Sequence, residues 1–118
     1  EIEHYSMENG YLTTKRILAE NENVTAVYAT ADLLAVGACR AILEAGRRIP
    51  QDISVAGYDG ISLGEYYNPK LTTIRQPAKE MAGETIRLMF DVIAGKERHR
   101  QIVFEAELVE RESAGPVS

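Results

Sequence analysis

Residues 25–60 read TAVYATADLLAVGACRAILEAGRRIPQDISVAGYDG, and this stretch decides the fold class. Thr25 to Ala29 is a short run rich in β-forming residues, and an apolar helical pattern follows from Leu33 to Ala45. Gly46 stands where helices commonly end in a left-handed residue. Ile53 to Tyr58 is nearly apolar on both faces, as strands of a buried parallel sheet are. The stretch therefore predicts a strand, a helix and a second strand.

A further helix is expected before this unit. Ser6 and Asn9 are both residue types that cap helix N-termini, and either could start the helix. Its pattern continues through Tyr11 and Leu18 at helical spacing and ends at the asparagines of residues 21–23. The chain thus enters the strand–helix–strand unit from a helix.

Beyond Gly60 the same alternation continues. We expect a short helix from Ile61 to Tyr67 and a third strand from Leu71 to Arg75. A long helix follows, with Pro77 at a favoured first-turn position and Gly95 at its end. Alternating apolar residues predict a final extended segment; they are Ile102, Phe104, Ala106 and Leu108. Strands that alternate with helices in this way indicate an α/β fold with a mostly parallel sheet flanked by helices.

Composition narrows the class of protein. The 118 residues fit one domain, and the net charge of −5 makes this segment a poor binder of nucleic acid, which prefers basic surfaces. The single cysteine, Cys39, cannot form an internal disulfide, and this usage fits a reducing compartment such as the cytoplasm. No apolar run is long enough to span a membrane, so no membrane partner is expected.

The sequence offers little that would support catalysis or metal binding. His4 and His99 are isolated and far apart, whereas metal sites need clustered ligands. No combination of nucleophile, histidine and acid is evident, and the glycines form no phosphate-binding motif. We therefore expect no enzyme activity, no cofactor and no metal.

Two segments carry a resemblance to a known family. They are GRRIPQDISVAGYDG, within residues 46–60, and LTTIRQP, residues 71–77, which ELVERES follows at residues 107–113. This chain resembles the lactose-repressor/galactose-repressor (LacI/GalR) family from about Tyr5 to Ser113. The resemblance implies part of a periplasmic-binding-protein-like (type I) lobe. It also implies that residues 1–118 are a C-terminal fragment of the effector-binding and dimerisation domain, without the DNA-binding head and the first lobe.

The resemblance implies a function in transcription regulation. In such a regulator a small effector, expected to be a sugar, closes two lobes and changes the conformation of the DNA-binding end. Operator DNA would be bound only through the missing head, and the protein would act as a homodimer. The alternative is an exported sugar-binding protein of a transport system, which shares the fold. A further alternative is a signalling receiver with Asp59 as phosphoacceptor, although the required acidic cluster is not visible and Arg75 is not the required lysine.

Three residues are candidates for effector binding. Ligands of open α/β sheets bind beyond the carboxyl ends of the strands, where Asp59 and Gln76 both lie. A carboxylate accepts two hydrogen bonds from neighbouring sugar hydroxyls, and an amide both donates and accepts. The resemblance places Asp59 and Gln76 at effector-contacting positions and Tyr5 at a position where an aromatic ring stacks on the ligand. The structural alternatives are a helix cap for Asp59, a loop residue for Gln76 and a surface residue for Tyr5.

A second loop contributes to the predicted site, which is incomplete because the resemblance implies an arginine and first-lobe residues that this chain lacks. Thr30, Ala31 and Asp32 match a loop that carries an Asn or Asp facing the ligand in many relatives. Ala31 departs from that pattern and lacks the hydrogen bond, which leaves the class of ligand in doubt. For Asp32 the alternative is an N-cap of the following helix.

The resemblance also implies a dimer surface. It is built by the helix from Leu33 to Ala45 and the segment from Ile61 to Tyr67, in which Val36, Tyr66 and Tyr67 are expected to face the partner; tyrosine is enriched at interfaces. The alternative is that Val36 belongs to the core and the tyrosines to the surface. A second apolar stripe, of Met81, Ile86, Met89 and Ile93, would be exposed without the first lobe and would favour self-association of the isolated chain.

Overall fold

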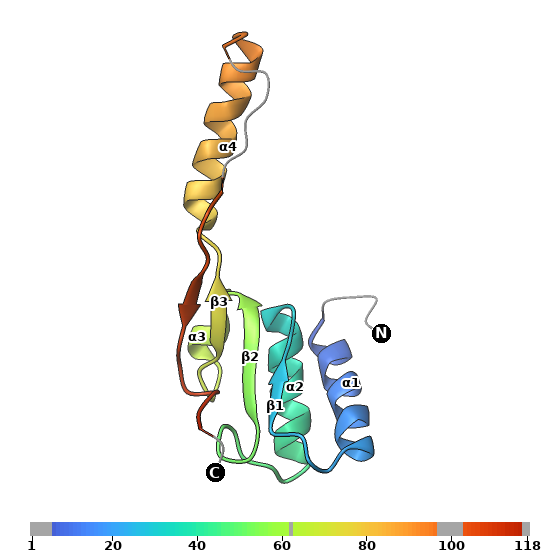
Figure 1. The fold of residues 1–118 in the computed structure, drawn as a ribbon. Helices are drawn as coiled ribbons and strands as arrows, with labels where there is room; N and C mark the ends of the chain where they lie inside the picture. The colour runs from blue at the N-terminus through green and yellow to red at the C-terminus, as the bar shows by residue number, and fades with distance from the viewer. Residues whose placement is uncertain (1–5, 62, 97–102, 117–118) are drawn as a thin grey trace. The chain divides into compact units, whose positions relative to one another are not determined.

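A computed structural model of the chain describes residues 6–61, 63–96 and 103–116. It confirms the predicted alternation of four helices and four strands within these residues (Figure 1). The chain divides into two compact units, each considered separately below. Unit 1 comprises residues 1–75 and 108–118, and unit 2 comprises residues 76–107.

A four-stranded sheet forms the centre of unit 1. Its strands are β1 (Ala26–Tyr28), β2 (Ser54–Asp59), β3 (Thr72–Arg75) and β4 (Glu107–Val109), in the order β1-β2-β3-β4. The pairs β1–β2 and β2–β3 are parallel, and Asp59 lies opposite Arg75 in the register. Because these three strands are parallel, their carboxyl ends meet at one edge of the sheet.

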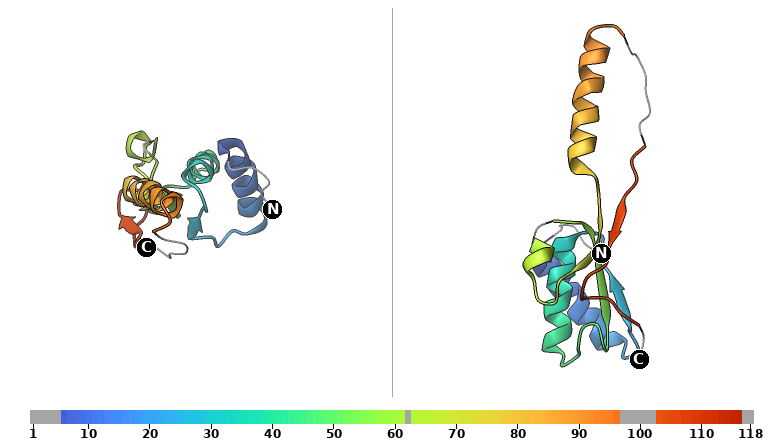
Figure 2. Two further views of the ribbon diagram at one scale, coloured as in Figure 1. Left: turned by 90° about the horizontal axis from the view of Figure 1, so that it is seen from above. Right: turned by 90° about the vertical axis from the view of Figure 1, so that its left-hand side faces the viewer.

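Helices α1 (Met7–Glu20), α2 (Asp32–Glu44) and α3 (Leu63–Tyr66) lie to one side of this sheet, with α1 beside α2 (Figure 2). Ser6 rather than Asn9 caps α1, because the Ser6 hydroxyl accepts a hydrogen bond of 3.1 Å from the Asn9 N–H. Gly46 follows α2 with a φ of +79°, the left-handed conformation predicted for it.

The predicted start of α2 is corrected by one residue. Asp32 was expected to cap this helix, but Ala31 holds the N-cap position and makes no side-chain cap bond. Asp32 is instead the first helical residue and is only 1% exposed. Its carboxylate points into the fold and takes partners from other segments, which local sequence preference does not encode.

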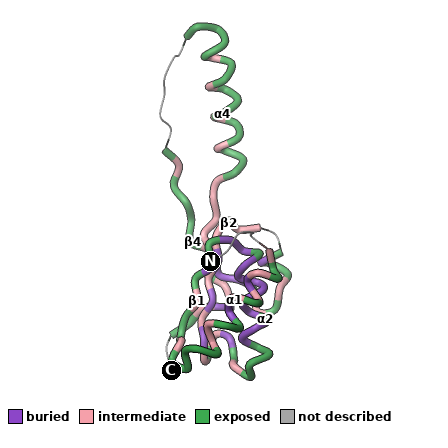
Figure 3. The backbone as a smooth tube through the Cα atoms, turned by 90° about the vertical axis from the view of Figure 1, so that its right-hand side faces the viewer, coloured by how far each residue is buried: buried purple, intermediate pink, exposed green. Residues whose placement is uncertain are grey.

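The hydrophobic core lies between α2 and the sheet (Figure 3). Leu34, Cys39 and Ile42 contribute from α2, and Val55 and Leu71 from β2 and the start of β3. Val36 is 5% exposed and belongs to the same core. Burial alternates along residues 53–58: Ile53, Val55 and Gly57 are buried, whereas the residues between them are half-buried. One face of β2 therefore packs in the core, and the expected burial of both faces is not found.

The segment after β4 is fastened to the start of β2 and β3. The Ser113 hydroxyl accepts from the Thr72 N–H at 2.8 Å and donates to the Val55 carbonyl at 2.6 Å. The Val55 N–H in turn donates to the Ser113 carbonyl at 2.8 Å, and Ser113 is fully buried. This seryl side chain thus joins three segments that are far apart in the sequence.

Burial of Cys39 gives a direct test of the α2–sheet packing. The side chain is 0% exposed, and burial raises the pKa of its thiol to about 12. Since the thiolate is the reactive species, we expect a chromogenic disulfide reagent at pH 8 to react at least about 100-fold more slowly with the folded protein than with the denatured protein. Equal rates in the two states would contradict this packing.

Unit 2 contains helix α4 (Ala78–Ile93), with Pro77 at the N-cap and Gly95 left-handed at a φ of +75°. None of its residues is buried. In the predicted stripe Ile86 is 56%, Met89 59% and Ile93 77% exposed, whereas Met81 is half-buried. The predicted extended segment is shorter than expected: residues 103–106 form no strand, and Ile102 lies outside the described residues. In the described residues, no helix combines the length and hydrophobicity needed to cross a membrane.

Candidate functional site

The carboxyl ends of β1, β2 and β3 form the candidate site on unit 1. Asp59 ends β2 and is exposed, while Thr30, also exposed, follows β1. Arg75 ends β3 opposite Asp59. The structure therefore brings Asp59 and the Thr30 loop to the same edge of the sheet, as the sequence predicted.

The turn that carries Asp59 has an unusual backbone. Asp59 has a φ of +112° and Gly60 a φ of +73°, so two successive residues are left-handed. Non-glycine residues adopt such angles at a cost of about 1–3 kcal/mol, and only where their surroundings hold them. A Cβ on Gly60 would lie 2.9 Å from the Arg75 Cβ, which leaves room for glycine alone. The Asp59 carboxylate is therefore set by a turn that is packed closely on β3.

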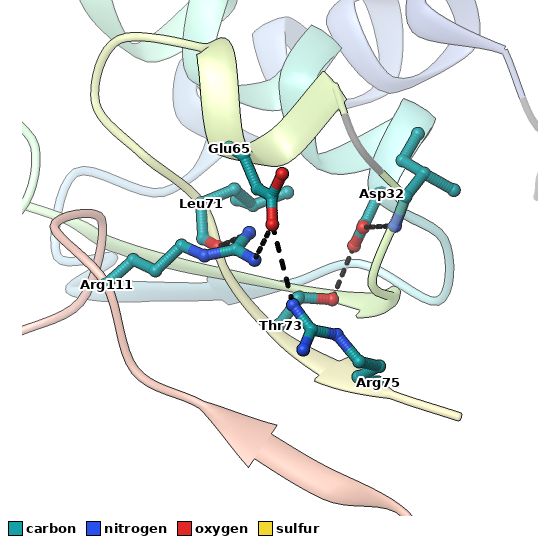
Figure 4. A network of polar contacts seen from close by, with 7 residues as sticks. Asp32, Glu65, Leu71, Thr73, Arg75 and Arg111 are labelled. Carbon is teal, nitrogen blue, oxygen red and sulfur yellow. Dashed lines mark hydrogen bonds and ion pairs between the residues drawn. The ribbon is translucent and has the colours of Figure 1, made fainter. Parts of the chain in front are cut away.

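A buried carboxylate lies behind this turn. Asp32 Oδ2 accepts from the Ile61 N–H at 2.8 Å, and Asp32 Oδ1 accepts from the Thr73 hydroxyl at 2.6 Å (Figure 4). With the side chain 1% exposed and both oxygens engaged, the prediction that Asp32 touches an effector directly does not fit the structure. Ala31 is also buried, at 8% exposure.

An ion-pair cluster flanks the same edge. Glu65 on α3 lies 3.7 Å from the Arg75 guanidinium and 3.6 Å from that of Arg111 (Figure 4). The Arg111 side chain is only 11% exposed and also donates to the Leu71 carbonyl at 3.0 Å. Arg111 thus stabilises the packing of its neighbours, whereas Arg75, 42% exposed, places a positive charge beside the carboxyl edge of the sheet.

Two predicted residues fall elsewhere. Gln76 belongs to unit 2, so its prediction as an effector contact stays a prediction. Tyr5 lies outside the described residues. The role of Asp59 and Thr30 in binding likewise stays a prediction, although their location agrees with it.

Sequence reasoning missed Thr73, Arg75 and Ile61 as parts of this site. One signal was available for Thr73: it sits in the middle of a buried strand, and buried hydroxyls need hydrogen-bond partners. The contribution of Ile61 is its backbone N–H, which carries no trace in the side-chain pattern. Arg75 was weighed only against the lysine of a signalling receiver, and the following Gln76 was taken as the candidate at this strand end.

A separate groove lies on α1 and α2. It has a volume of about 370 Å³ and includes Tyr11, Val36, Gly37, Arg40 and Tyr67 among its lining residues. Val36 and Tyr67 are two of the three predicted dimer residues, and the third, Tyr66, is 85% exposed. The structure thus shows an apolar groove with an exposed tyrosine nearby in the sequence.

Charged groups border this groove. The Tyr11 hydroxyl donates to Glu44, and Arg40 Nε lies 3.0 Å from the other Glu44 oxygen. The hydrogen bond from Tyr11, together with Arg40, lowers the pKa of Glu44, while the pKa of Tyr11 is raised by the same bond. Burial raises the pKa of the Tyr67 phenol, which at its ordinary pKa is already neutral at physiological pH.

Comparisons with known proteins agree across nearly the whole chain. The family described as periplasmic binding protein-like domain matches residues 3–114. The HTH-type transcriptional regulator MalR of Clostridium butyricum is 36% identical over 109 residues, which are 92% of this chain and 32% of that protein. The chain therefore spans about a third of the length of this curated relative.

Solved structures give the same picture. A LacI family transcriptional regulator from Enterococcus faecium with bound ribose superposes with a TM-score of 0.87 at 35% identity, over 98% of this chain and 42% of that one. The lac repressor dimer bound to operator and an anti-inducer superposes with a TM-score of 0.87 at 32% identity, over 92% of this chain and 38% of that one.

Proposed function

Because the chain belongs to the periplasmic binding protein-like domain family, in its LacI/GalR branch, we propose that it is part of a sugar-responsive transcription regulator. In that regulator it forms one wall of the effector site. The observation that carries the proposal is the exposed residue Asp59 at the carboxyl edge of the parallel sheet. Such an edge is where ligands of open α/β sheets bind. A carboxylate there suits a ligand rich in hydroxyl groups.

The longer protein would contain the parts that this chain lacks. We propose a DNA-binding head and a first lobe preceding residues 1–118, with operator DNA bound through that head and no membrane involved. The effector shifts the regulator between two states only if it binds them with different affinities. The relatives compared above are transcription regulators, which favours regulation over the alternative of an exported sugar-binding protein. With this function we propose a cytoplasmic location and no catalysis.

A sugar screen on the full-length protein tests the proposal. D-ribose, lactose and a panel of other mono- and disaccharides are added in thermal unfolding experiments, followed by calorimetric titration of those that act. A ligand at 100 times its Kd stabilises the folded state by about 2.7 kcal/mol, which gives a clear rise in the unfolding midpoint. The O-methylated form of an active sugar is the control, because it keeps the ring but cannot donate hydrogen bonds. A panel without any effect contradicts the proposal.

The groove on α1 and α2 is proposed as part of a homodimer interface. Its apolar lining and the 85% exposure of Tyr66, which adjoins the lining residue Tyr67, suit a second copy of the protein. A relative that is a dimer superposes on 92% of the chain. Aromatic residues at the centre of interfaces often contribute about 2 kcal/mol or more, so the placement of Tyr66 can be tested by substitution.

We expect Tyr66→Glu to weaken the dimer about 30-fold, because it buries an unpaired charge in an apolar interface. Its exposure in the single chain means that the monomer fold should be unaffected. Analytical ultracentrifugation over a range of concentrations measures the dimer constant. Tyr66 adjoins Tyr67, which lines the groove, whereas Tyr28 is 58% exposed on β1 and neither it nor its neighbours in the sequence line the groove, so Tyr28→Glu is the matched control. Equal dimer constants for the two variants would exclude Tyr66 from the interface.

A further inference from the structure

The buried carboxylate of Asp32 has no role in the proposed contact with an effector, yet it lies next to the site and accepts two hydrogen bonds. Burying a carboxylate is costly unless hydrogen bonds compensate for the lost hydration. Here a backbone N–H and a hydroxyl both donate to it, at 2.8 Å from Ile61 and 2.6 Å from Thr73. The groups that Asp32 holds in place therefore indicate the role of this buried carboxylate.

Asp32 reaches three segments at the carboxyl edge of the sheet. Thr73 belongs to β3, and Ile61 follows the turn after β2. On β2 itself, a Cβ added to Gly57 would lie 2.4 Å from Asp32 Oδ1, so the carboxylate approaches the strand where only glycine leaves room. The first residue of α2 thus connects two strands and the turn between β2 and α3.

The turn held in this way is the one that carries Asp59. Two left-handed residues, Asp59 and Gly60, immediately precede Ile61. The Ile61 N–H is fixed by Asp32 on one side of the turn, and Gly60 packs on Arg75 on the other. Without the hydrogen bond to Asp32, we expect Asp59 to relax from its strained φ of +112° to a negative φ. This change would redirect the Asp59 carboxylate.

We propose that Asp32 is a positioning residue that holds the Asp59–Ile61 turn in its binding geometry before an effector arrives. This rests on the proposed function, in which Asp59 binds the effector. Pre-organisation of this kind lowers the ordering cost of binding. Asp32 therefore acts on affinity through Asp59 and makes no contact with the sugar.

The first test needs no ligand. Amide hydrogen exchange of Ile61 is compared with that of Val55, whose N–H donates to Ser113 in the core. In Asp32→Ala we expect the ratio of the Ile61 rate to the Val55 rate to rise at least about 10-fold, since the Ile61 N–H loses its acceptor. An unchanged ratio in a folded variant overturns the proposal.

Two further variants separate a local effect from general loss of stability. Asp32→Asn keeps one oxygen for the Ile61 N–H and can donate its amide to Thr73, so the ratio should lie between those of the unaltered protein and Asp32→Ala. Thr73→Val removes the other partner of Asp32 and is expected to speed exchange of both amides together. If Asp32→Ala does not fold, the proposal requires a higher ratio in Asp32→Asn than in Thr73→Val, and the reverse order rejects it.

The second test is a double-mutant cycle with D-ribose on the full-length protein. If Asp32 acts through Asp59, Asp32→Asn should weaken binding about 3- to 10-fold in the unaltered protein and have little effect in the Asp59→Asn background. Additive effects of the two substitutions overturn the positioning role while leaving the proposed function intact. An Asp59→Asn variant with unchanged ribose affinity removes the proposed function instead, and the exchange ratio then still decides whether Asp32 holds the turn.

Discussion

Asp59→Asn is expected to weaken sugar binding by the full-length regulator about 30- to 100-fold. Hydrogen bonds to charged groups contribute about 1.5–3 kcal/mol each, and the amide can replace only one of the two carboxylate acceptors. Asparagine tolerates left-handed backbone angles better than most residues, so the turn at a φ of +112° is kept and only the charge is changed. Calorimetric titration with the sugar selected by the screen measures the effect.

Two controls make this result specific. Asp59→Ala removes the side chain but also places alanine in a left-handed conformation, and should lower the unfolding temperature where Asp59→Asn does not. Asp52→Asn makes the same chemical change shortly before the first residue of β2, at the end of the strand opposite Asp59. Asp52 pairs with Arg48 there at 3.2 Å, and its substitution should leave the affinity for the sugar unchanged. If Asp52→Asn and Asp59→Asn weaken binding equally, the effect is general and Asp59 is not a contact.

Gly37→Ala is expected to destabilise the fold by about 3 kcal/mol or more, although alanine normally favours a helix over glycine by about 1 kcal/mol. The reason is the close crossing of α1 and α2. A Cβ on Gly37 would lie 1.9 Å from the Met7 carbonyl oxygen, and one on Gly10 would lie 2.2 Å from the Leu34 carbonyl oxygen. These obstacles are backbone atoms, which cannot move aside as a flexible side chain can.

Thermal unfolding measures this effect, and a fall in the unfolding midpoint of about 10 °C is expected for a domain of this size. Gly83→Ala on α4 is the matched control, because no atom lies within 4 Å of its added Cβ. It should be neutral or stabilise by up to about 1 kcal/mol. A Gly37→Ala variant as stable as the control would mean that α1 and α2 are further apart than described.

The order of elements was predictable because each one carries a local signal. Ser6 marks the start of α1, Gly46 and Gly95 mark the ends of α2 and α4, and apolar residues run along β2. These signals depend only on neighbours in the sequence. The carboxyl edge of the sheet, and with it the location of Asp59, followed from the strand order.

The parts that could not be predicted depend on residues far apart in the sequence. Asp32 looked like a helix cap because its type is preferred there, yet its partners are 29 and 41 residues away. Val36 was expected at a partner surface, and the structure adds that it is 5% exposed and packs in the core as well as lining the groove, so its role in a dimer stays a prediction. The effector itself is beyond prediction here, because the chain supplies only one wall of the proposed site.

The Ser113 connection has a consequence for how the protein is made. Ser113 follows Thr72 by 41 residues and Val55 by 58, so it is translated only after the whole of unit 2. At about 5–20 residues per second, Thr72 lacks this partner for about 2–8 seconds and Val55 for about 3–12 seconds. During that interval the amino ends of both strands present unpaired backbone groups. The nascent chain should therefore be a better chaperone client, and a better protease substrate, than the released protein.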